Sequence, residues 1–393
     1  MKVFIITKQA FPHGMAAAKR ISCYAKGLIS AGIDCEVIIA TRTEIYGKQP
    51  KNIIAKAGFF TYISNKTQRE SNVLIRRLND YKDTIMTLRY IIKNSTNKDV
   101  ILNYLREDSL NSLIIKAAKK TGAKVVRDLC EFPYGTGEET VKIKSKRNSF
   151  LKNIFPKFDG FICISEPLLD LANKYKSPDA KVIKVPILIE PKESETEELI
   201  FSPIKTPYIF HSGTLYEQKD GILGAIEAFA IASTRLSFPV KYVLTGNLSK
   251  SPNKVDIEKL IEKYCIQDKI IFTGFLETSD LIAYQKSCTM MIINKLDNQQ
   301  NKYCFATKLG DYLLAEKPVI TTDIGESTNY LKDGESAYIV ESGNIAILAK
   351  KIEDVFTDTV NNKIIAENGK KVALTYFSYN TQGSRLADFL KNL

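Results

Sequence analysis

Residues 305–320 have the sequence FATKLGDYLLAEKPVI. Thr307 is a typical N-cap residue, which predicts a helix that starts there and packs on a strand over residues 317–323. The backbone amides at the start of this helix would carry partial positive charge, to which Lys308 adds. Asp311 follows one turn later. The arrangement suits a diphosphate at the helix start and a ribose diol at the carboxylate. The alternative is a capped helix with a purely structural role.

Outside this stretch, strand-like and helix-like runs alternate along the whole chain. Continuous apolar strands separated by helices indicate parallel sheets that are covered on both faces. The first helix is predicted from Met15 to Ala31, with Gly32 as its C-terminal cap. The predicted strands are residues 3–7, 35–41, 99–105, 124–129, 160–165 and 181–189, followed by 208–213, 241–246, 270–275, 289–294, 317–323 and 336–340.

Residues 190–207 break the alternation, because their sequence EPKESETEELIFSPIKTP is acidic, contains three prolines and has no period. We therefore predict a linker here, between an N-terminal domain of residues 1–189 and a C-terminal domain of residues 208–375. Ligands of open α/β sheets bind at the carboxyl ends of the strands, so a cleft between the two domains is the predicted site.

The composition is that of an ordinary globular protein of 393 residues, 44% hydrophobic and 25% charged, which excludes collagen-like and disordered classes. Seven scattered cysteines without a C-x-x-C pair support neither a zinc site nor a disulfide framework. The apolar run at the N-terminus is too short for a signal peptide, and no stretch approaches the length of a membrane span. These features predict a cytoplasmic protein with reduced cysteines.

The net charge of +12 is unevenly distributed. Residues 1–190 contain 33 Lys and Arg against 18 Asp and Glu, a net of +15, whereas the remainder has 23 against 26, a net of −3. A basic half is expected to meet something anionic, such as phospholipid, phosphate or nucleic acid. No RNA- or DNA-binding motif is present, so a nucleic-acid partner is not expected.

The most basic segment is residues 141–158, VKIKSKRNSFLKNIFPKF, in which apolar residues recur at helical spacing. Such a helix can lie on the anionic inner face of a membrane, which would make the protein peripherally membrane-associated. The alternative is a helix whose apolar stripe packs into its own domain. A second basic and aromatic region that could join it contains Lys51, Lys56, Phe59, Phe60, Tyr62, Lys66 and Arg69.

Several predicted strands end at a glycine, which permits a tight turn and lets a ligand approach backbone amides. Neither G-x-G-x-x-G nor the P-loop pattern occurs, so a dinucleotide fingerprint is unsupported. The two histidines, His13 and His211, are both predicted in loops at the cleft, either as ligand contacts or as ordinary loop residues. The chain has no D-x-D pattern, and no metal is expected.

The stretch 305–320 resembles the P-x-K-L-x-E-Y-L-A-x-G-K-P-V-I segment of retaining glycosyltransferases of family 4, of the bacterial surface-polysaccharide type, which have the GT-B fold. Other segments are similar to further motifs of that family, in the same order along nearly the whole chain. They are the Gly14 loop, Val125–Pro133 (similar to D-x-H-E-x-P), Gly160–Leu168 (similar to D-G-x-I-x-I-S-x-x-L), Ser212–Gly221 (similar to S-G-x-L-x-x-x-K-D-G) and Ile270–Leu276.

The resemblance implies an α/β fold of two Rossmann-like parallel domains facing a central cleft, with residues 376–393 as a helix that crosses back to the first domain. Lys219 matches the catalytic basic residue that neutralises the donor's diphosphate as the glycosidic bond breaks. Asp311 matches an acid that binds the ribose, and Gly14 matches an amide donor to the diphosphate. The remaining matched donor-binding positions are Gly213, Thr214 and Gly246 at strand ends, Phe275 and Leu276 at the nucleobase, and Phe305, Ala306, Thr307 and Lys308 at the diphosphate or donor sugar.

Four positions depart from the family pattern. Tyr303 stands where the first of two acidic residues is expected, and Asp311 replaces the usual Glu. Cys130 replaces a histidine before Glu131, and Thr214 replaces a common arginine. These departures affect contacts with the donor sugar or acceptor, for which the candidates are His13, Cys130, Glu131 and Tyr303.

The resemblance implies a hexosyltransferase of class EC 2.4. It would move a sugar from a nucleotide-diphosphate donor, UDP favoured over GDP, to a glycan or lipid-linked glycan with retention of configuration. No cofactor is expected beyond the donor, which is a substrate. Two alternatives stay open. One is a GT-B sugar-nucleotide epimerase, which would need acid and base residues in the cleft, and the other is a non-catalytic GT-B partner protein.

Overall fold

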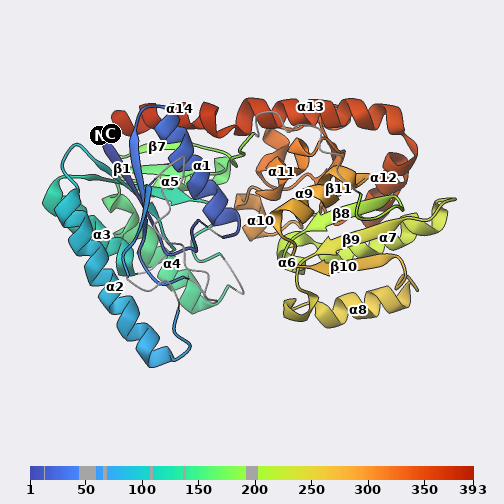
Figure 1. Ribbon diagram of the computed structural model, residues 1–393, viewed down its shortest axis with the longest axis horizontal. Helices are drawn as coiled ribbons and strands as arrows, with labels where there is room; N and C mark the ends of the chain where they lie inside the picture. Colours follow the sequence, from blue (N-terminus) through green and yellow to red (C-terminus); the bar gives the residue numbers. More distant parts are fainter. Residues whose placement is uncertain (13, 44–58, 65–68, 107–108, 136–138, 192–201) are drawn as a thin grey trace. The chain divides into compact units, whose positions relative to one another are not determined.

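The computed structural model describes residues 1–12, 14–43, 59–64, 69–106, 109–135, 139–191 and 202–393. The chain divides into two compact units (Figure 1). The first contains Met1–Glu190 together with Ser378–Leu393, and the second contains Pro191–Phe377. Each unit has one parallel sheet with helices packed on it.

The first unit has a seven-stranded sheet in the order β3-β2-β1-β4-β5-β6-β7, in which every neighbouring pair is parallel. Its central strands are apolar along nearly their whole length and are buried on both faces, as a helix-covered parallel sheet requires. The strands are β1 (Lys2–Thr7), β2 (Asp34–Ile39), β3 (Phe59–Tyr62), β4 (Val100–Tyr104), β5 (Lys124–Leu129), β6 (Gly160–Cys163) and β7 (Lys181–Lys184).

Five strands of the first unit, β1, β3, β4, β5 and β6, are each followed along the chain by a helix. The C-terminal helix α14 packs against α1, and Gly27 and Gly383 allow the two backbones to approach closely. A Cβ on Gly27 would lie 2.8 Å from the Gly383 Cα, so a side chain at this crossing would force the helices apart. The helices are α1 (Ala16–Ser30), α2 (Val73–Asn94), α3 (Ser109–Thr121), α4 (Val141–Asn153), α5 (Glu166–Tyr175) and α14 (Tyr379–Lys391).

The second unit has a six-stranded parallel sheet in the order β10-β9-β8-β11-β12-β13. The strands are β8 (Tyr208–Ser212), β9 (Lys241–Thr245), β10 (Ile270–Gly274), β11 (Met290–Ile293), β12 (Val319–Thr322) and β13 (Tyr338–Val340). The helices are α6 (Glu217–Asp220), α7 (Ile222–Arg235), α8 (Lys254–Lys263), α9 (Thr278–Ser287), α10 (Gln299–Tyr303), α11 (Lys308–Leu314), α12 (Ile345–Thr357) and α13 (Thr359–Phe377).

The prediction of two parallel α/β sheets is confirmed, and every strand expected from the sequence is present. The run 181–189 ends as a strand already at Lys184. The edge strand β3 was not predicted, and it includes Phe60, which belonged to the proposed membrane-facing region. Phe60 is instead buried against Phe11, with the two ring centroids 5.5 Å apart. Residues 44–58, 65–68 and 192–201, which include much of that region and of the expected linker, lie outside the described residues.

Of the two interpretations of residues 141–158, the structure shows the one in which the apolar stripe packs internally. Phe150, Leu151, Phe155 and Phe158 are all at most 5% exposed. The rings of Phe155 and Phe161 stack with centroids 4.3 Å apart, which ties the segment to strand β6. These side chains are therefore not available to enter a bilayer. No helix within the described ranges is both long and apolar enough to cross a membrane.

Candidate functional site

The candidate site lies in the second unit, where two neighbouring strands of the sheet end. Strands β8 and β11 are paired in parallel, so the segments that follow them meet at the same edge of the sheet. Asp220 follows β8 at the end of the short helix α6, and Lys295 follows β11. Lys308 comes from a third segment, at the start of α11.

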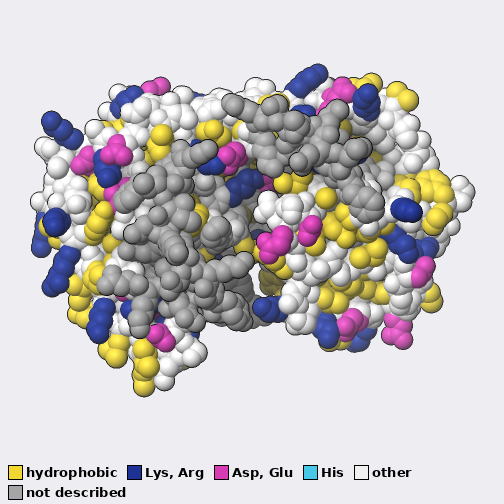
Figure 2. All heavy atoms as spheres, in the orientation of Figure 1, with side chains coloured by type: hydrophobic (Ala, Val, Ile, Leu, Met, Phe, Trp, Pro, Cys, Tyr) yellow, Lys and Arg dark blue, Asp and Glu magenta, His cyan; other side chains and the backbone are white. Residues whose placement is uncertain are grey.

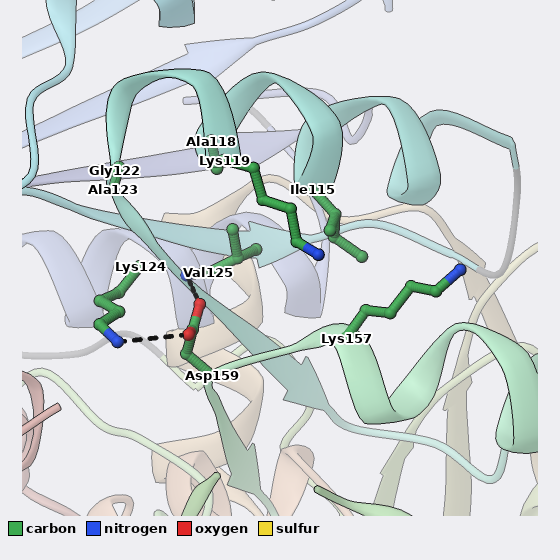
Figure 3. Close-up of a pocket in the computed structure, with 9 residues that line it drawn as sticks. All are labelled: Ile115, Ala118, Lys119, Gly122, Ala123, Lys124, Val125, Lys157 and Asp159. Carbon is green, nitrogen blue, oxygen red and sulfur yellow. Dashed lines mark hydrogen bonds and ion pairs between the residues drawn. The ribbon is translucent and has the colours of Figure 1, made fainter. Parts of the chain in front are cut away.

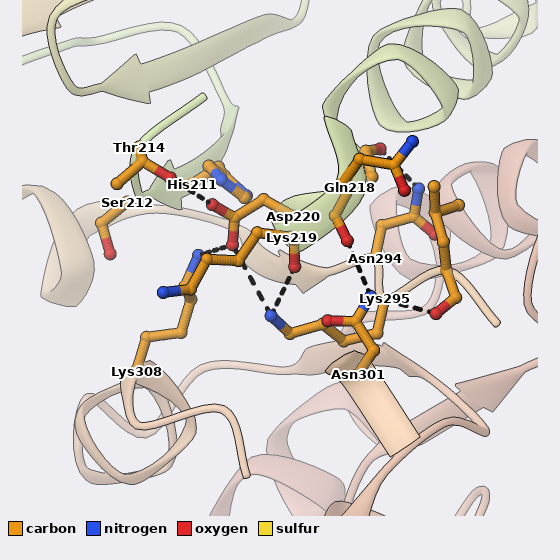
Figure 4. Close-up of polar contacts among 12 residues, drawn as sticks. His211, Ser212, Thr214, Gln218, Lys219, Asp220, Asn294, Lys295, Asn301 and Lys308 are labelled. Atoms are coloured by element: carbon orange, nitrogen blue, oxygen red, sulfur yellow. Dashed lines mark hydrogen bonds and ion pairs between the residues drawn. The ribbon is translucent and has the colours of Figure 1, made fainter. Parts of the chain in front are cut away.

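The carboxylate of Asp220 is the centre of this cluster (Figure 4). Lys308 Nζ donates a hydrogen bond to Asp220 Oδ1 at 2.7 Å, and Lys295 Nζ lies 3.9 Å from the same oxygen. Thr214 Oγ1 donates to Asp220 Oδ2 at 3.2 Å. Lys295 Nζ also donates to the Lys219 carbonyl at 2.5 Å. Two ammonium groups thus face one carboxylate, and the charge of a third lysine, Lys219, acts on Lys308, so the cluster carries excess positive charge.

The pKa shifts of Asp220 and Lys308 reflect the same excess of positive charge. Burial alone raises the pKa of Asp220, but Lys308 and Lys295 lower it by more, so the carboxyl stays ionised well below its usual range. Burial lowers the pKa of Lys308, which Asp220 opposes and Lys295 and Lys219 reinforce. The net shift of Lys308 is downward because one carboxylate does not compensate for desolvation and two further ammonium groups. An added anion would relieve this repulsion.

His211 lies beside the cluster, but in strand β8, so its predicted place in a loop is wrong. The ring is 1% exposed, and its Nδ1 lies 3.3 Å from the Ile292 carbonyl. Its Nε2 is buried and has no hydrogen-bond partner among the described residues. Burial, followed by the Lys308 charge, lowers the pKa of His211 to about 3, so the ring is neutral near pH 7.

Glycine is required at two of the strand ends for steric reasons. A Cβ on Gly213 would lie 2.8 Å from Lys308 Nζ and 2.9 Å from Asp220 Oδ2, inside the ion pair. Gly246 has a φ of +136°, and a Cβ there would lie 2.3 Å from the Gly213 carbonyl oxygen. Gly213 therefore leaves the space that the Lys308 side chain occupies, and Gly246 lets the Gly213 backbone approach closely.

The stretch 305–320 forms the predicted helix and strand, but with different local roles. Thr307 precedes α11 in helical backbone conformation and its side chain makes no capping hydrogen bond. Phe305 is 2% exposed and stacks on Tyr330, with ring centroids 5.5 Å apart, so its side chain is part of the core. Ala306 and Asp311 are half-buried, and Thr307 is exposed. Lys308 is the residue of this stretch that joins the charged cluster.

The other donor-side candidates of the second unit have different degrees of exposure. Phe275, just after β10, is 80% exposed, which is unusual for a large aromatic side chain. Leu276 is half-buried, as is Tyr303 at the end of α10. Lys219 is half-buried next to Asp220 and Lys295 (Figure 4).

In the first unit, Cys130 belongs to a separate buried cluster at the end of β5. Its Sγ donates to Asp128 Oδ1 at 2.8 Å, and Arg20 Nε lies 3.3 Å from Asp128 Oδ2. Burial and the Asp128 carboxylate raise the pKa of the Cys130 thiol well above its ordinary value. The following residue, Glu131, is exposed. A Cβ on Gly14 would lie 2.5 Å from the Ala10 carbonyl oxygen, and His13 lies outside the described residues.

A cavity of about 250 Å³ lies elsewhere in the first unit (Figure 3). Its polar lining includes Lys119, Lys124, Lys157 and Asp159, and the Asp159 carboxylate accepts from the Val125 amide at 2.8 Å. Lys124 begins β5, so the cavity is at the amino end of the strand whose carboxyl end leads to Cys130. It is therefore distinct from the positions that the sequence singled out.

Sequence reasoning missed Asp220 and Lys295 as members of the site. Asp220 was part of the quoted S-G-x-L-x-x-x-K-D-G similarity, but only Lys219 was given a role from it. Lys295 has no local signal, because it becomes relevant only through the pairing of β8 with β11. In the described part of the chain, no group of three or more His, Cys, Asp and Glu residues is arranged to hold a metal.

The charged cluster lies inside the part of the chain that matches a known protein family model. A family model described as glycosyl transferases group 1 matches residues 194–372. An alpha-D-kanosaminyltransferase of Streptomyces kanamyceticus is 22% identical over 48% of this chain and 46% of its own length. The capsular polysaccharide biosynthesis glycosyltransferase CapM of Staphylococcus aureus is 28% identical over 28% of this chain and 34% of its own. The matched segment thus spans less than half of each curated relative.

A solved structure is similar over the whole chain. Anabaena Alr3699/HepE, in complex with UDP and glucose, superimposes with a TM-score of 0.75 at 15% identity, covering 100% of both chains. At this identity the likeness establishes the fold, which is that of GT-B glycosyltransferases. The chain therefore has the GT-B fold, and its residues 194–372 match the glycosyl transferases group 1 model.

Proposed function

We propose that this protein is a retaining glycosyltransferase that transfers a hexose-type sugar from a nucleotide-diphosphate donor to a glycan or lipid-linked glycan. The observation that carries the proposal is the excess of positive charge around Asp220, inside the segment that matches the family. Lys308, Lys295 and Lys219 supply three ammonium groups where the sheet's strands end, which is where α/β sheets bind phosphates.

The proposed chemistry is stabilisation of a leaving group. The bond between the sugar C1 and the diphosphate oxygen breaks, and negative charge accumulates on the departing diphosphate. Lys219, with support from Lys308, neutralises that charge in a partly buried setting, where fixed cations act more strongly than in water. The acceptor hydroxyl oxygen bonds to C1 on the same face, and its proton passes to the leaving diphosphate. Retention then needs no enzymic nucleophile.

The proposed donor is a UDP-sugar in preference to a GDP-sugar. HepE, which has the same fold, is described in complex with UDP and glucose, and this supports the choice of nucleotide. The exposed Phe275 ring is proposed to stack on the nucleobase, and Asp311 to bind the ribose. The kanosaminyltransferase and CapM similarities support a sugar-transfer role and, for CapM, a polysaccharide product.

The test is a thermal-shift panel of UDP, GDP, ADP, CMP and their sugar conjugates, followed by a turnover assay with the donor that binds. A ligand at 100 times its dissociation constant stabilises the folded state by about 2.7 kcal/mol. Lys219→Ala and Asp311→Ala should each weaken nucleotide binding, whereas Lys259→Ala, an exposed lysine on α8, should not. If neither of the first two variants weakens binding or turnover, the assigned site is wrong. Silence across the panel would favour the non-catalytic partner protein.

We also propose that the reaction uses no metal and no cofactor, and that the protein acts in the cytoplasm. The seven free cysteines fit a reducing compartment. Turnover that is unchanged by EDTA and by added Mg²⁺ or Mn²⁺ is the expected result. Loss of activity in EDTA that Mn²⁺ restores would show that a metal is needed.

A further inference from the structure

Helix α2 of the first unit exposes an unusual amount of apolar surface. Of the exposed large hydrophobic side chains in the described residues, seven belong to this single helix. Leu74, Leu78 and Tyr81 are 70%, 63% and 67% exposed, and Val73, Ile75, Met86 and Ile92 are between 42% and 48% exposed. Isolated exposed hydrophobic residues are ordinary, but a contiguous group on one element indicates an interaction surface.

The face of α2 that packs on its own unit is, in contrast, largely polar. Its fully buried residues are Asp83, Thr87 and Ile91. Arg42 Nε lies 3.6 Å from the Asp83 carboxylate, and Thr87 Oγ1 donates to the Asp83 carbonyl at 2.8 Å. Tyr90 OH also donates to Glu36 Oε1 on β2 at 2.5 Å. The helix is therefore amphipathic in the inverted sense, with polar contacts inward and apolar side chains outward.

Four of the exposed residues and the half-buried Ile85 form one stripe, which we call the α2 stripe and define as Leu74, Leu78, Tyr81, Ile85 and Ile92. Their spacing is i, i+4, i+7, i+11 and i+18, which places them on one face of a helix. That face is opposite the buried Asp83, which is nine residues from both Leu74 and Ile92, because residues nine apart along a helix lie half a turn apart.

Basic side chains border the α2 stripe. Arg77, Lys82, Arg89 and Lys93 are all exposed, and the helix as a whole contains five Lys and Arg against two Asp. One of those two, Asp83, is buried and faces Arg42, so it does not offset the exposed charge. Figure 2 shows hydrophobic and basic side chains next to each other along the part of the surface where α2 lies in Figure 1.

We propose that α2 docks on an anionic phospholipid surface, with the α2 stripe among the acyl chains and the bordering Lys and Arg at the headgroups. A second copy of this helix is the less suitable partner, because self-association would bring the two sets of basic side chains together. An anionic bilayer instead satisfies both features at once, by burying apolar area and neutralising the cations. The inference is independent of sugar transfer, and it assigns a surface other than residues 141–158.

The chain contains no tryptophan, which permits a clean fluorescence test on the full-length protein. Leu78→Trp places a single indole in the α2 stripe, and Val255→Trp places one at a 58% exposed position on α8 in the second unit. With vesicles of phosphatidylcholine and phosphatidylglycerol, Trp at position 78 should show emission at shorter wavelength and higher intensity, and Trp at position 255 should not. Vesicles of phosphatidylcholine alone should produce little change at either position.

Binding is measured in parallel by co-sedimentation with the same vesicles. Leu78→Glu should weaken partitioning about tenfold or more, because it removes a leucine that the bilayer would bury and places a charge there instead. Arg89→Glu should weaken it about fivefold or more and reduce its salt dependence. Val255→Glu is the matched control and should leave binding unchanged. Circular dichroism and the melting temperature verify folding, and both should be preserved because these side chains face solvent.

Three results would overturn the proposal. The first is equal binding of the wild-type protein to neutral and anionic vesicles. The second is unchanged binding by the folded Leu78→Glu variant. The third is a concentration-dependent dimer in light scattering that Leu78→Glu dissociates, without vesicle binding by the wild-type monomer, which would identify α2 as an interface between copies.

Discussion

Both units bury a carboxylate near the carboxyl end of a central strand, and they compensate its charge in different ways. In the first unit, Asp128 faces one guanidinium, that of Arg20, which also donates to the Val185 and Pro186 carbonyls at 2.9 and 2.5 Å. In the second unit, Asp220 faces two ammonium groups directly and a third nearby. The first cluster is a neutral ion pair, whereas the second contains more positive than negative charge.

The largest expected effect is a loss of folding stability when the Arg20–Asp128 ion pair is broken. Arg20→Met leaves Asp128 buried without its partner and leaves two backbone carbonyls unsatisfied, so it should cost about 3–5 kcal/mol of stability. Urea unfolding followed by circular dichroism measures the change. Arg235→Met is the control, because its pair with Glu353 is half exposed on the Arg235 side and should cost less than about 1 kcal/mol.

The double variant Arg20→Met/Asp128→Asn sharpens this prediction. Replacing the carboxylate by a neutral amide should recover a substantial part of the loss, since the cost comes from an uncompensated charge. If the double variant is as unstable as the single one, lost packing rather than uncompensated charge explains the stability lost in Arg20→Met.

The next largest expected effect is a loss of stability of the second unit in acid, caused by the low pKa of His211. Its folded-state pKa of about 3 is below the ordinary 6.5, so the unfolded chain binds the additional proton between these values. The neutral ring therefore contributes stability that is fully present above about pH 6.5 and is lost as the pH falls toward 3. The loss should be on the order of a few kcal/mol.

Melting temperature against pH measures this effect. His211→Asn can still donate toward the Ile292 carbonyl but cannot titrate, so its profile should be flatter between pH 4 and 6.5 than that of the wild type, with these limits set roughly by the two pKa values. His13→Asn, at the other histidine of the chain, is the comparison. A wild-type slope that survives in His211→Asn would assign the titration to another group.

A smaller effect should distinguish the two clusters by their influence on UDP binding. Lys308→Met should weaken UDP binding about tenfold, because it removes one charge-assisted contact to the diphosphate. Arg20→Met, measured at a temperature where it stays folded, should leave UDP affinity unchanged. Titration calorimetry measures both. Equal affinity of the Lys308→Met variant and the wild type would mean that this lysine serves only to hold Asp220.

The smallest effect is a difference in thiol reactivity. Cys265 is exposed, whereas Cys130 has a thiol pKa raised by burial and by Asp128. A native protein should therefore react quickly with a disulfide reagent at Cys265 and slowly at Cys130. Cys265→Ser should remove the fast phase, and Cys130→Ser should retain it. A fast phase that disappears in Cys130→Ser would show that the first cluster opens readily to solvent.

The sequence was most informative where the pattern is local. Alternating apolar runs predicted the parallel strands, and glycines 213 and 246 were predicted at strand ends where the structure needs them. The edge strand β3 was missed because its neighbouring sequence is basic and lacks a period. His211 was assigned to a loop although it lies inside the run 208–213 that was itself predicted as a strand, and the structure follows the strand prediction.

Helices α2 and α4 show the limit of amphipathic patterns. Both are basic and both carry recurring apolar residues, but α4 turns its apolar side inward and α2 turns its apolar side outward. The pattern predicts that a helix has an apolar face. Whether that face points to the core or to solvent depends on which side chains of the unit pack against the helix. In α2, Arg42 and Glu36 attract the polar side instead.

By itself, the sequence determined the fold class of this protein, because burial of strands and helices is encoded in the spacing of apolar residues within short windows. The charged site was decided only by the tertiary structure. Asp220 and Lys308 are 88 residues apart, and Lys295 reaches them because β8 and β11 are neighbours in the sheet. Electrostatic interactions act through distance in space, and that distance is set by strand order, which no local pattern specifies.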